Sequence, residues 1–170
     1  MRERLYRWFL RAWRHVPRGV RRRLVRALSP SFTVGSICVI ERPDGAILLV
    51  KHIYRSDWGI PGGLLKRGEE PADAARREVA EEVGLAIELV GEPAVVVESR
   101  LQRVDLVFRA RPRELAELES VRPRSAEIEQ VRWFAPGELP RLQPETATAL
   151  VALARAAASG RVAPAPLLED

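Results

Sequence analysis

The chain has 170 residues, 46% of them hydrophobic and 30% charged, so it is long enough to bury one sizeable core and has the composition of a soluble globular protein. Its single cysteine excludes an internal disulfide and any zinc site built from several cysteines. No apolar stretch has the length that spans a bilayer, and no apolar segment followed by a cleavage site stands near residue 1, so we expect a cytoplasmic protein.

The net charge of +5 is unevenly distributed along the chain. Residues 1–29 contain ten arginines and one acidic residue, whereas residues 30–170 contain 18 basic and 22 acidic residues. The basic character therefore belongs to the N-terminal segment. We predict a basic helical N-terminal extension over residues 1–30, a main domain over residues 31–160 and a loose C-terminal tail over residues 161–170.

The first 16 residues have the pattern of an amphipathic helix. Apolar residues recur at steps of three and four, and arginines fill most of the other side. Pro17 interrupts the pattern, and residues 20–28 predict a second short basic helix. The apolar positions are Leu5, Trp8, Phe9, Ala12, Trp13 and Val16. We expect this face to dock on the main domain or in a homodimer; weak contact of residues 1–29 with a membrane surface or with RNA is the alternative.

Residues 33–41 and 46–52 are runs of β-branched and aliphatic side chains. The sequence Arg-Pro-Asp-Gly at positions 42–45 separates them and has the residues that a tight turn requires. The pattern predicts a β-hairpin. Cys38 lies inside the first apolar run, which indicates a buried structural thiol rather than a nucleophile.

The stretch from Gly63 to Leu85, GLLKRGEEPADAARREVAEEVGL, joins a glycine-containing loop to a helix. Pro71 suits the first position of a helix, where its missing N–H costs nothing, and Gly84 suits a left-handed cap at the other end. The helix is therefore predicted over residues 71–83. Its apolar stripe, which can pack on a sheet, consists of Ala72, Ala75, Val79 and Val83.

Three glutamates of this helix, Glu78, Glu81 and Glu82, stand at the spacing that places side chains on one face. Like charges held so close are unfavourable unless protons or a cation neutralise them. Hard divalent cations such as Mg²⁺ favour a site made of oxygen ligands. A solvated acidic surface is the competing interpretation of the same residues.

The rest of the chain mixes strands and helices. Strands are predicted over residues 86–90, 94–100 and 104–112, and a further strand ends at Trp133 and Phe134 before a short helical turn. Residues 114–119 form a short helix or an acidic loop, and residues 144–159 form an alanine-rich helix. This order of elements indicates an α/β protein in which a mixed sheet lies between helices.

The spacing of Gly63, Glu69, Arg77-Glu78-Val79, Glu81-Glu82 and Gly84-Leu85 resembles the Nudix box of the Nudix hydrolase superfamily at every defined position. The lead-in Trp-Gly-Ile-Pro-Gly-Gly at positions 58–63 is also similar to that of many Nudix domains. The resemblance implies the Nudix fold, an α/β/α sandwich with a mixed β-sheet, here with the basic helical extension in front of it.

The resemblance also implies an enzyme that hydrolyses a pyrophosphate bond with the help of Mg²⁺ or Mn²⁺. Glu78, Glu82 and Glu81 are then metal ligands, together with the backbone carbonyl of Gly63. One of Glu78 and Glu81 accepts the proton of the attacking water. Arg77 and Glu69 pair with each other and hold the loop against the helix.

Four further residues complete the predicted site. By resemblance, a later loop supplies one more carboxylate, which we assign to Glu127; a solvated edge residue is the alternative. Lys66 and Arg67 are placed to meet the far phosphates of a substrate, or they form surface salt bridges. Trp58 is a candidate for stacking on a base, although packing beside a glycine turn explains it equally well.

The substrate implied is a phosphorylated small molecule, a nucleotide above all. Position 101 is a leucine, whereas some Nudix subfamilies carry a proline there for ADP-ribose or a tyrosine for dinucleoside polyphosphates. By elimination we expect a nucleoside triphosphate or a nucleotide-linked metabolite. The alternatives are a regulator that senses nucleotides without cleaving them and an RNA 5′-end pyrophosphohydrolase.

Overall fold

The computed structural model describes residues 2–160, and these form two compact units that divide after Phe32. The predicted loose tail over residues 161–170 lies outside the described residues. Within residues 2–160, no helix is both long enough and apolar enough to cross a membrane.

The first unit contains two helices, α1 (Arg2–Trp13) and α2 (Arg18–Leu28). Both helices were predicted from the sequence, and Pro17 separates them as expected, standing directly before α2 with extended backbone. α1 ends three residues earlier than the predicted boundary at residue 16. No residue of α2 is buried.

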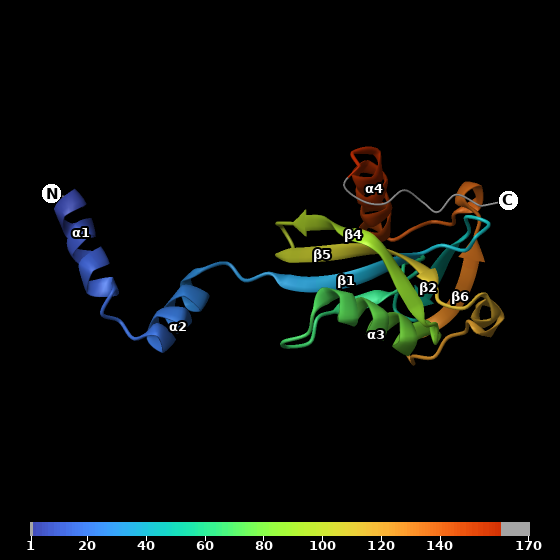
Figure 1. The fold of residues 1–170 in the computed structure, drawn as a ribbon, viewed down its shortest axis with the longest axis horizontal. Helices are drawn as coiled ribbons and strands as arrows, with labels where there is room; N and C mark the ends of the chain where they lie inside the picture. Colours follow the sequence, from blue (N-terminus) through green and yellow to red (C-terminus); the bar gives the residue numbers. More distant parts are fainter. Residues whose placement is uncertain (1, 161–170) are drawn as a thin grey trace. The chain divides into compact units, whose positions relative to one another are not determined.

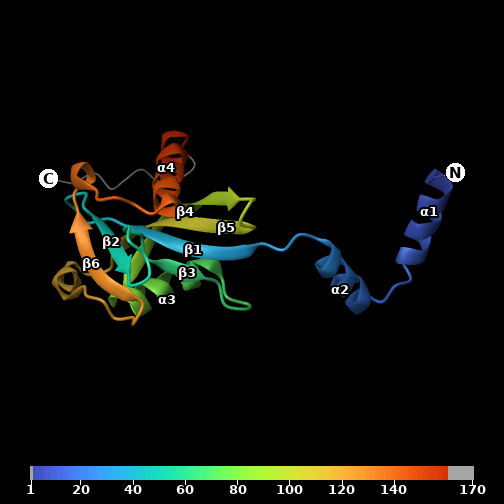
Figure 2. The same cartoon turned by 180° about the vertical axis from the view of Figure 1, so that it is seen from behind.

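The second unit is built around a four-stranded sheet in the order β3, β1, β5, β4. Its strands are β1 (Thr33–Ile40), β3 (Gly62–Leu64), β4 (Ile87–Glu98) and β5 (Arg103–Pro112). β1 and β5 are parallel, whereas the other neighbours are antiparallel, so the sheet is mixed as predicted (Figure 1). A second pair of antiparallel strands, β2 (Ile47–His52) and β6 (Ile128–Phe134), lies side by side next to it (Figure 2).

The predicted β-hairpin of residues 33–41 and 46–52 is wrong. The turn forms, because Gly45 N–H donates to Arg42 O at 2.9 Å, but the two strands then diverge into different sheets. A single bridge between Glu41 and Ile47 joins them. The reason is that β1 has β3 on one side and β5 on the other, so it offers no free edge to β2.

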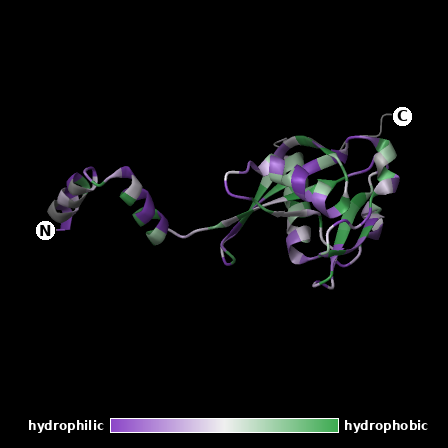
Figure 3. Cartoon of the chain, turned by 90° about the horizontal axis from the view of Figure 1, so that it is seen from below, coloured by the Kyte–Doolittle hydropathy of each residue, from purple (hydrophilic) through white to green (hydrophobic). Residues whose placement is uncertain are grey.

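Two helices cover the sheet from opposite sides, α3 (Pro71–Val83) and α4 (Pro144–Ala158) (Figure 1). β1 serves both layers because its side chains alternate: Cys38 and Ile40 pack in the core beneath α3, while Ile37 and Val39 pack in the core beneath α4. The hydrophobic colouring of the central strands in Figure 3 reflects this burial on both faces. The structure is therefore the predicted α/β/α sandwich.

Two predicted strands, 86–90 and 94–100, are one strand in the structure. β4 continues from Ile87 to Glu98, and a bulge between Val90 and Ala94 shifts its register against β5. Gly91 in this bulge has a φ of 68°, which a glycine adopts without strain. The remaining connections contain two short 3₁₀ helices, η1 (Leu115–Ser120) and η2 (Pro136–Glu138).

Candidate active site

Helix α3 carries the first part of the site, and its ends are fixed as the sequence predicts. Pro71 occupies the first turn, and Gly84 ends the helix in the left-handed conformation with a φ of 71°. The apolar stripe is buried against the sheet at Ala75, Val79 and Val83. This packing fixes the rotation of the helix and therefore the direction of its glutamates.

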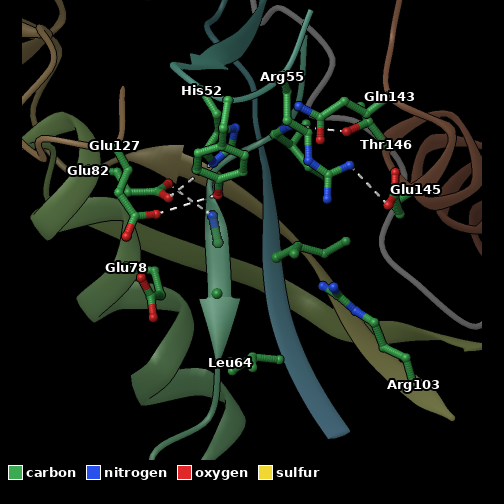
Figure 4. A pocket seen from close by; sticks show the side chains of 15 residues that line it. His52, Arg55, Leu64, Glu78, Glu82, Arg103, Glu127, Gln143, Glu145 and Thr146 are labelled. Carbon is green, nitrogen blue, oxygen red and sulfur yellow. Dashed lines mark hydrogen bonds and ion pairs between the residues drawn. The ribbon is translucent and has the colours of Figure 1, made fainter. Parts of the chain in front are cut away.

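A cavity of about 460 Å³ opens beside α3. One wall is acidic: Glu78 and Glu82 come from α3, and Glu127 comes from the loop just before β6 (Figure 4). Glu78 and Glu82 are neighbours because residues four positions apart lie on one face of a helix. The structure thus brings Glu127 to the same cavity as Glu78 and Glu82 of the Nudix-box stretch Gly63–Leu85.

Glu82 is the most buried of these carboxylates, with 8% of its surface exposed. Gly62 N–H donates to its Oε2 at 3.1 Å, and His52 Nε2 lies 3.9 Å from its Oε1. Burial raises the pKa of Glu82 to about 8, and the negative charges of Glu78 and Glu127 act in the same direction. The side chain therefore holds a proton more tightly than an ordinary glutamate.

Arg77, on α3, holds the loop before this helix in place through Glu69. Its Nε and Nη2 donate to the two oxygens of Glu69 at 2.6 and 2.9 Å, and its Nη1 donates to Glu78 Oε1 at 2.7 Å. Glu69 also accepts a hydrogen bond from Lys66 N–H at 2.7 Å. The hydrogen bonds from Arg77 lower the pKa of Glu69 to about 2, so this carboxylate is ionised at neutral pH. The structure brings Arg77 and Glu69 together as a bidentate pair.

Gly63 lies directly against the acidic wall. A Cβ atom at this position would stand 2.4 Å from Glu78 Oε1, which is closer than non-bonded atoms approach. The absence of a side chain therefore lets the backbone of Gly63 approach the carboxylate of Glu78, and both residues line the cavity.

Glu81 is not brought to this cavity. Its side chain is 54% exposed and interacts with Arg77 Nη1 at 3.2 Å and Lys66 Nζ at 3.6 Å. The helix explains the difference, because residue 81 is rotated toward solvent relative to residues 78 and 82. Lys66 is thus engaged in an ion pair with Glu81, and Arg67 is exposed and outside the set of residues that line the cavity.

Trp58 is a packing residue in this structure. Its ring meets the ring of Phe134 edge-on, with 4.9 Å between centroids, and packs against the core beneath α4. Its backbone also bonds to the chain at Arg141 and Gln143. The residues that line the cavity do not include Trp58, so the structure favours the packing interpretation over stacking on a base.

The wall opposite the glutamates was not foreseen from the sequence. It includes Arg55, Arg103 and Glu145, which come from a loop, from β5 and from the first turn of α4 (Figure 4). Arg55 Nη1 donates to Glu145 Oε1 at 3.2 Å, and Arg103 Nε donates to Asp105 at 2.8 and 2.9 Å. Pro144, which starts α4, was the one local signal that residue 145 stands in a first helical turn.

Glu145 has an unusual environment at this wall. Its Oε2 is buried, and no atom of residues 2–160 forms a hydrogen bond with it. Burial acts to raise the pKa of Glu145, but hydrogen bonds from its own backbone N–H and from Arg55 outweigh burial and leave the pKa below its ordinary value. The carboxylate is therefore ionised and has an acceptor to spare.

A second cavity, of about 300 Å³, adjoins the first. Arg103, Glu145 and Ile37 line both, so the two cavities share a wall. The second one is more apolar, because Val96, Leu101 and Pro144 contribute to it. In the sequence, position 101 was notable only because it is neither the proline nor the tyrosine of two Nudix subfamilies. In the structure, Leu101 lines the cavity next to the candidate site.

The ligand atoms of the acidic wall are oxygens, which is the type of atom that a hard divalent cation prefers. Carboxylates of Glu78, Glu82 and Glu127 and the backbone of Gly63 line one cavity, and Mg²⁺ and Mn²⁺ prefer oxygen ligands. Within residues 2–160, no three acidic, histidine or cysteine side chains are placed to hold an ion as they stand. Glu78, which is bonded to Arg77, would have to reorient its carboxylate to take part.

Comparison with known proteins agrees with this geometry. The model of the NUDIX domain matches residues 31–154, which cover most of the chain. A "MutT-like protein" of Streptomyces ambofaciens is 32% identical over 110 residues, covering 65% of this chain and 68% of the relative. An "RNA pyrophosphohydrolase" of Psychrobacter cryohalolentis is 43% identical over 47 residues, which are only 28% of this chain and 27% of that protein.

Solved structures show the same fold. The crystal structure of a MutT NUDIX hydrolase from Burkholderia pseudomallei superposes with a TM-score of 0.57 and 30% identity, covering 71% of this chain and 97% of that one. The domain match, the sandwich and the intact box therefore agree. The chain belongs to the NUDIX family and is a Nudix hydrolase.

Proposed function

We propose that this Nudix hydrolase cleaves the pyrophosphate bond of a nucleoside triphosphate or of a nucleotide-linked metabolite. The observation that carries the proposal is one cavity with a carboxylate wall, Glu78, Glu82 and Glu127, opposite a wall that contains Arg55 and Arg103. A polyphosphate needs positive charge on its oxygens and a group that accepts a proton from water. The two walls divide these tasks.

The acidic wall is the part that would bind Mg²⁺ or Mn²⁺. Glu78, Glu82 and Glu127, with the carbonyl of Gly63, are the proposed ligands, and Glu81 joins them only by leaving Arg77 and Lys66. A bound cation supplies charge neutralisation on the phosphate oxygens and lowers the pKa of a water molecule. Either Glu78 or Glu81 is the proposed acceptor of the water proton; both are held by Arg77, which orients them.

The opposite wall is the proposed binding site for the substrate. Arg103 is 30% exposed and Arg55 41% exposed at the side chain, so both guanidinium groups are accessible to phosphate oxygens. Asp105 accepts a hydrogen bond from Arg103, and Glu145 accepts one from Arg55. Because both arginine side chains are already held in place, each loses less conformational entropy when a substrate binds. These arginines would fix the position of the polyphosphate relative to the acidic wall.

The second cavity is the proposed site for the base or the linked group. Val96, Leu101 and Pro144 offer apolar contact to a planar ring. Glu145 lines the same cavity, and its carboxylate could accept a hydrogen bond from an N–H donor on the edge of the ring if the buried Oε2 turned toward the cavity. A ring without such a donor would leave the carboxylate unpaired, which costs affinity. We therefore infer that Glu145 holds the base through an N–H group, which every common nucleobase presents.

The experiment is a screen for products with the full chain in Mg²⁺ and in Mn²⁺. Nucleoside triphosphates, nucleotide sugars, dinucleoside polyphosphates and 5′-triphosphate RNA are compared by chromatography of the nucleotides released. The proposal predicts a nucleoside monophosphate as one product from the preferred substrate. It also predicts that Glu145→Gln changes the ranking of bases more than it changes the ranking of linked groups.

The screen separates the alternatives. Preferential cleavage of the triphosphate RNA over free nucleotides would make the chain an RNA 5′-end pyrophosphohydrolase, the activity named for the short Psychrobacter match. Nucleotide binding by calorimetry without turnover of any substrate would favour a regulator on a Nudix scaffold and contradict the proposal.

A further inference from the structure

The segment that contains helices α1 and α2 has the most uneven charge distribution in the chain. Residues 1–29 contain ten arginines and one acidic residue. In α1, Arg7 and Arg11 are four residues apart, so they lie on one side of the helix. In α2 the arginines at positions 18, 22 and 26 form a second such row.

Both helices also carry large apolar side chains that are exposed. In α1, Tyr6 is 63% exposed and lies away from the arginines, and Trp8 is 68% exposed and lies at the border of the arginine side. In α2, Leu24 is 40% and Leu28 82% exposed, and both lie away from the arginine row. Figure 3 shows hydrophilic and hydrophobic residues along both helices. Large apolar side chains left in water carry an unfavourable free energy of hydration that grows with their exposed apolar area. The apolar sides therefore need a partner.

The partner must satisfy two conditions at once, an apolar surface for one side and negative charge for the other. We propose that α1 and α2 bind the surface of a bilayer that contains anionic phospholipid, with their apolar sides in the acyl region and their arginines at the phosphates. A helix with one strongly cationic side, aromatic and aliphatic residues on the other and low overall hydrophobicity is the type that lies in a membrane interface.

The observations favour a bilayer over the other partners. A second copy of these helices could cover the apolar sides, but it carries the same positive charge and offers no negative groups to the arginines. Single-stranded RNA would meet the arginines and could stack on Trp8 and Tyr6, but it offers no surface to Leu24, Val25 and Leu28. An anionic bilayer matches both sides along both helices.

A hollow lined by residues of both helices supports a site for phosphate groups. Trp13 of α1 and Arg21, Arg22, Val25 and Arg26 of α2 line one hollow of about 520 Å³. Three guanidinium groups beside an indole ring are suited to a phosphorylated headgroup, since arginine binds phosphate through two parallel N–H donors and tryptophan prefers the interface. The hollow would bind the headgroup region and not the acyl chains.

The test is sedimentation of the full chain with vesicles of phosphatidylcholine, with and without phosphatidylglycerol. Binding is expected to the vesicles with phosphatidylglycerol and to weaken as salt rises. Arg7→Gln with Arg11→Gln should weaken binding about fivefold for each arginine. Trp8→Ser with Leu24→Ser, which keeps the charge, should weaken it about tenfold or more, because the apolar contact is lost.

Val151→Ser is the matched control, because Val151 is an apolar residue of α4 that is 49% exposed but not part of α1 or α2. This variant should bind vesicles like the unchanged protein. Each variant is also assayed for hydrolysis of the best substrate, which should not change, because no substituted residue lines the catalytic cavity.

Three results would overturn the proposal. One is the absence of sedimentation with anionic vesicles. Another is binding that responds to the arginine variants but not to Trp8→Ser with Leu24→Ser, particularly if RNA gives the same pattern, since RNA needs only the charged side. The third is a concentration-dependent dimer in lipid-free solution that the Trp8 and Leu24 substitutions abolish, which would assign the apolar sides to a second copy.

Discussion

The missing side chain of Gly63 determines where the Glu78 carboxylate can lie. Gly63→Ala places a Cβ atom 2.4 Å from Glu78 Oε1, and the atom in its way is the end of a flexible side chain. We expect the fold to persist and Glu78 to move, so kcat should fall by about tenfold or more while the unfolding midpoint changes little. Steady-state kinetics and urea unfolding measure the two effects separately.

Gly137→Ala is the control for this substitution, because nothing lies within 4 Å of a Cβ atom at that position. It should leave both kcat and the unfolding midpoint unchanged. A Gly63→Ala protein with full activity would show that the close approach of Gly63 to Glu78 is irrelevant to catalysis.

Glu69 should make stability depend on pH in acid. Its pKa is about 2 in the folded chain, below the ordinary value of 4.5, because Arg77 donates two hydrogen bonds to it. Glu69 therefore adds stability above about pH 4.5, and this contribution is lost as the pH falls toward about 2. We expect the difference in urea midpoint between the unchanged protein and Glu69→Gln to shrink as the pH falls below about 4.5.

Urea unfolding at a series of pH values checks this prediction. Arg77→Lys is the second variant, because it keeps the charge but cannot reproduce the paired hydrogen bonds. A midpoint difference that stays constant from neutral to acid pH would mean that the Glu69–Arg77 pair does not perturb the titration of Glu69.

The sequence predicted the residues of the acidic wall better than those of the opposite wall. Glu78 and Glu82 follow from local helix geometry, and Glu127 follows from resemblance. Arg55, Arg103 and Glu145 belong to three segments far apart in the chain, and no short motif connects them. They meet because β1 pairs in parallel with β5 and α4 begins beside the cavity, and such contacts depend on tertiary structure.

At the scale of the elements, helix α3 was predictable because its start, its end and its stripe all carry local signals. Proline, glycine and the 3.6-residue period agree over residues 71–83. The hairpin prediction failed because a turn sequence fixes the turn but not which strands pair beyond it. The runs on either side of residues 42–45 are both rich in apolar residues, which indicates strands with both faces covered rather than an isolated hairpin with one face in water.

The end of α3 offers a test of the element itself. Gly84 has a φ of 71°, and a Cβ atom there would stand 2.4 Å from Arg124 Nε. We expect Gly84→Ala to lower the free energy of unfolding by about 1 kcal/mol, because alanine is strained in the left-handed region. Gly84→Asn should cost less, since asparagine tolerates this conformation and meets the same Arg124 side chain.

Urea unfolding of both variants checks the prediction. If Gly84→Ala and Gly84→Asn lower stability equally, the contact with Arg124 rather than the backbone conformation determines the cost.

At the scale of the whole molecule, the reactivity of the Cys38 thiol measures whether the core becomes exposed to solvent. It is fully buried in the central strand β1, and burial raises the pKa of its thiol to about 12. We expect no reaction with a thiol reagent at about pH 8 in the folded state, because neither access nor thiolate is available. In urea, the reaction should appear together with the loss of tertiary structure.

The appearance of reactive thiol is followed by absorbance, with tryptophan fluorescence as the measure of unfolding. Rapid labelling of Cys38 without urea would mean that β1 opens locally and that the two cores on its faces are not one cooperative unit.

The candidate catalytic cavity lies beside a sandwich whose two cores share β1. Composition and element order were sufficient to predict the sandwich. They could not predict that β2 leaves β1 to pair with β6, although this pairing brings His52, at the end of β2, and Glu127, in front of β6, to the cavity. The site therefore depends on the second pair of strands as much as on the box.

The most direct test of the central claim is the activity of Glu82→Gln on the best substrate, beside Glu138→Gln, an exposed glutamate of η2 outside the cavity. The substitution keeps the shape of Glu82 but replaces its carboxyl group, which can ionise and bind a cation, by an amide, which cannot ionise. We predict a loss of kcat of at least about a hundredfold for Glu82→Gln and no change for Glu138→Gln. Full activity of Glu82→Gln would contradict the assignment of this cavity as the catalytic site.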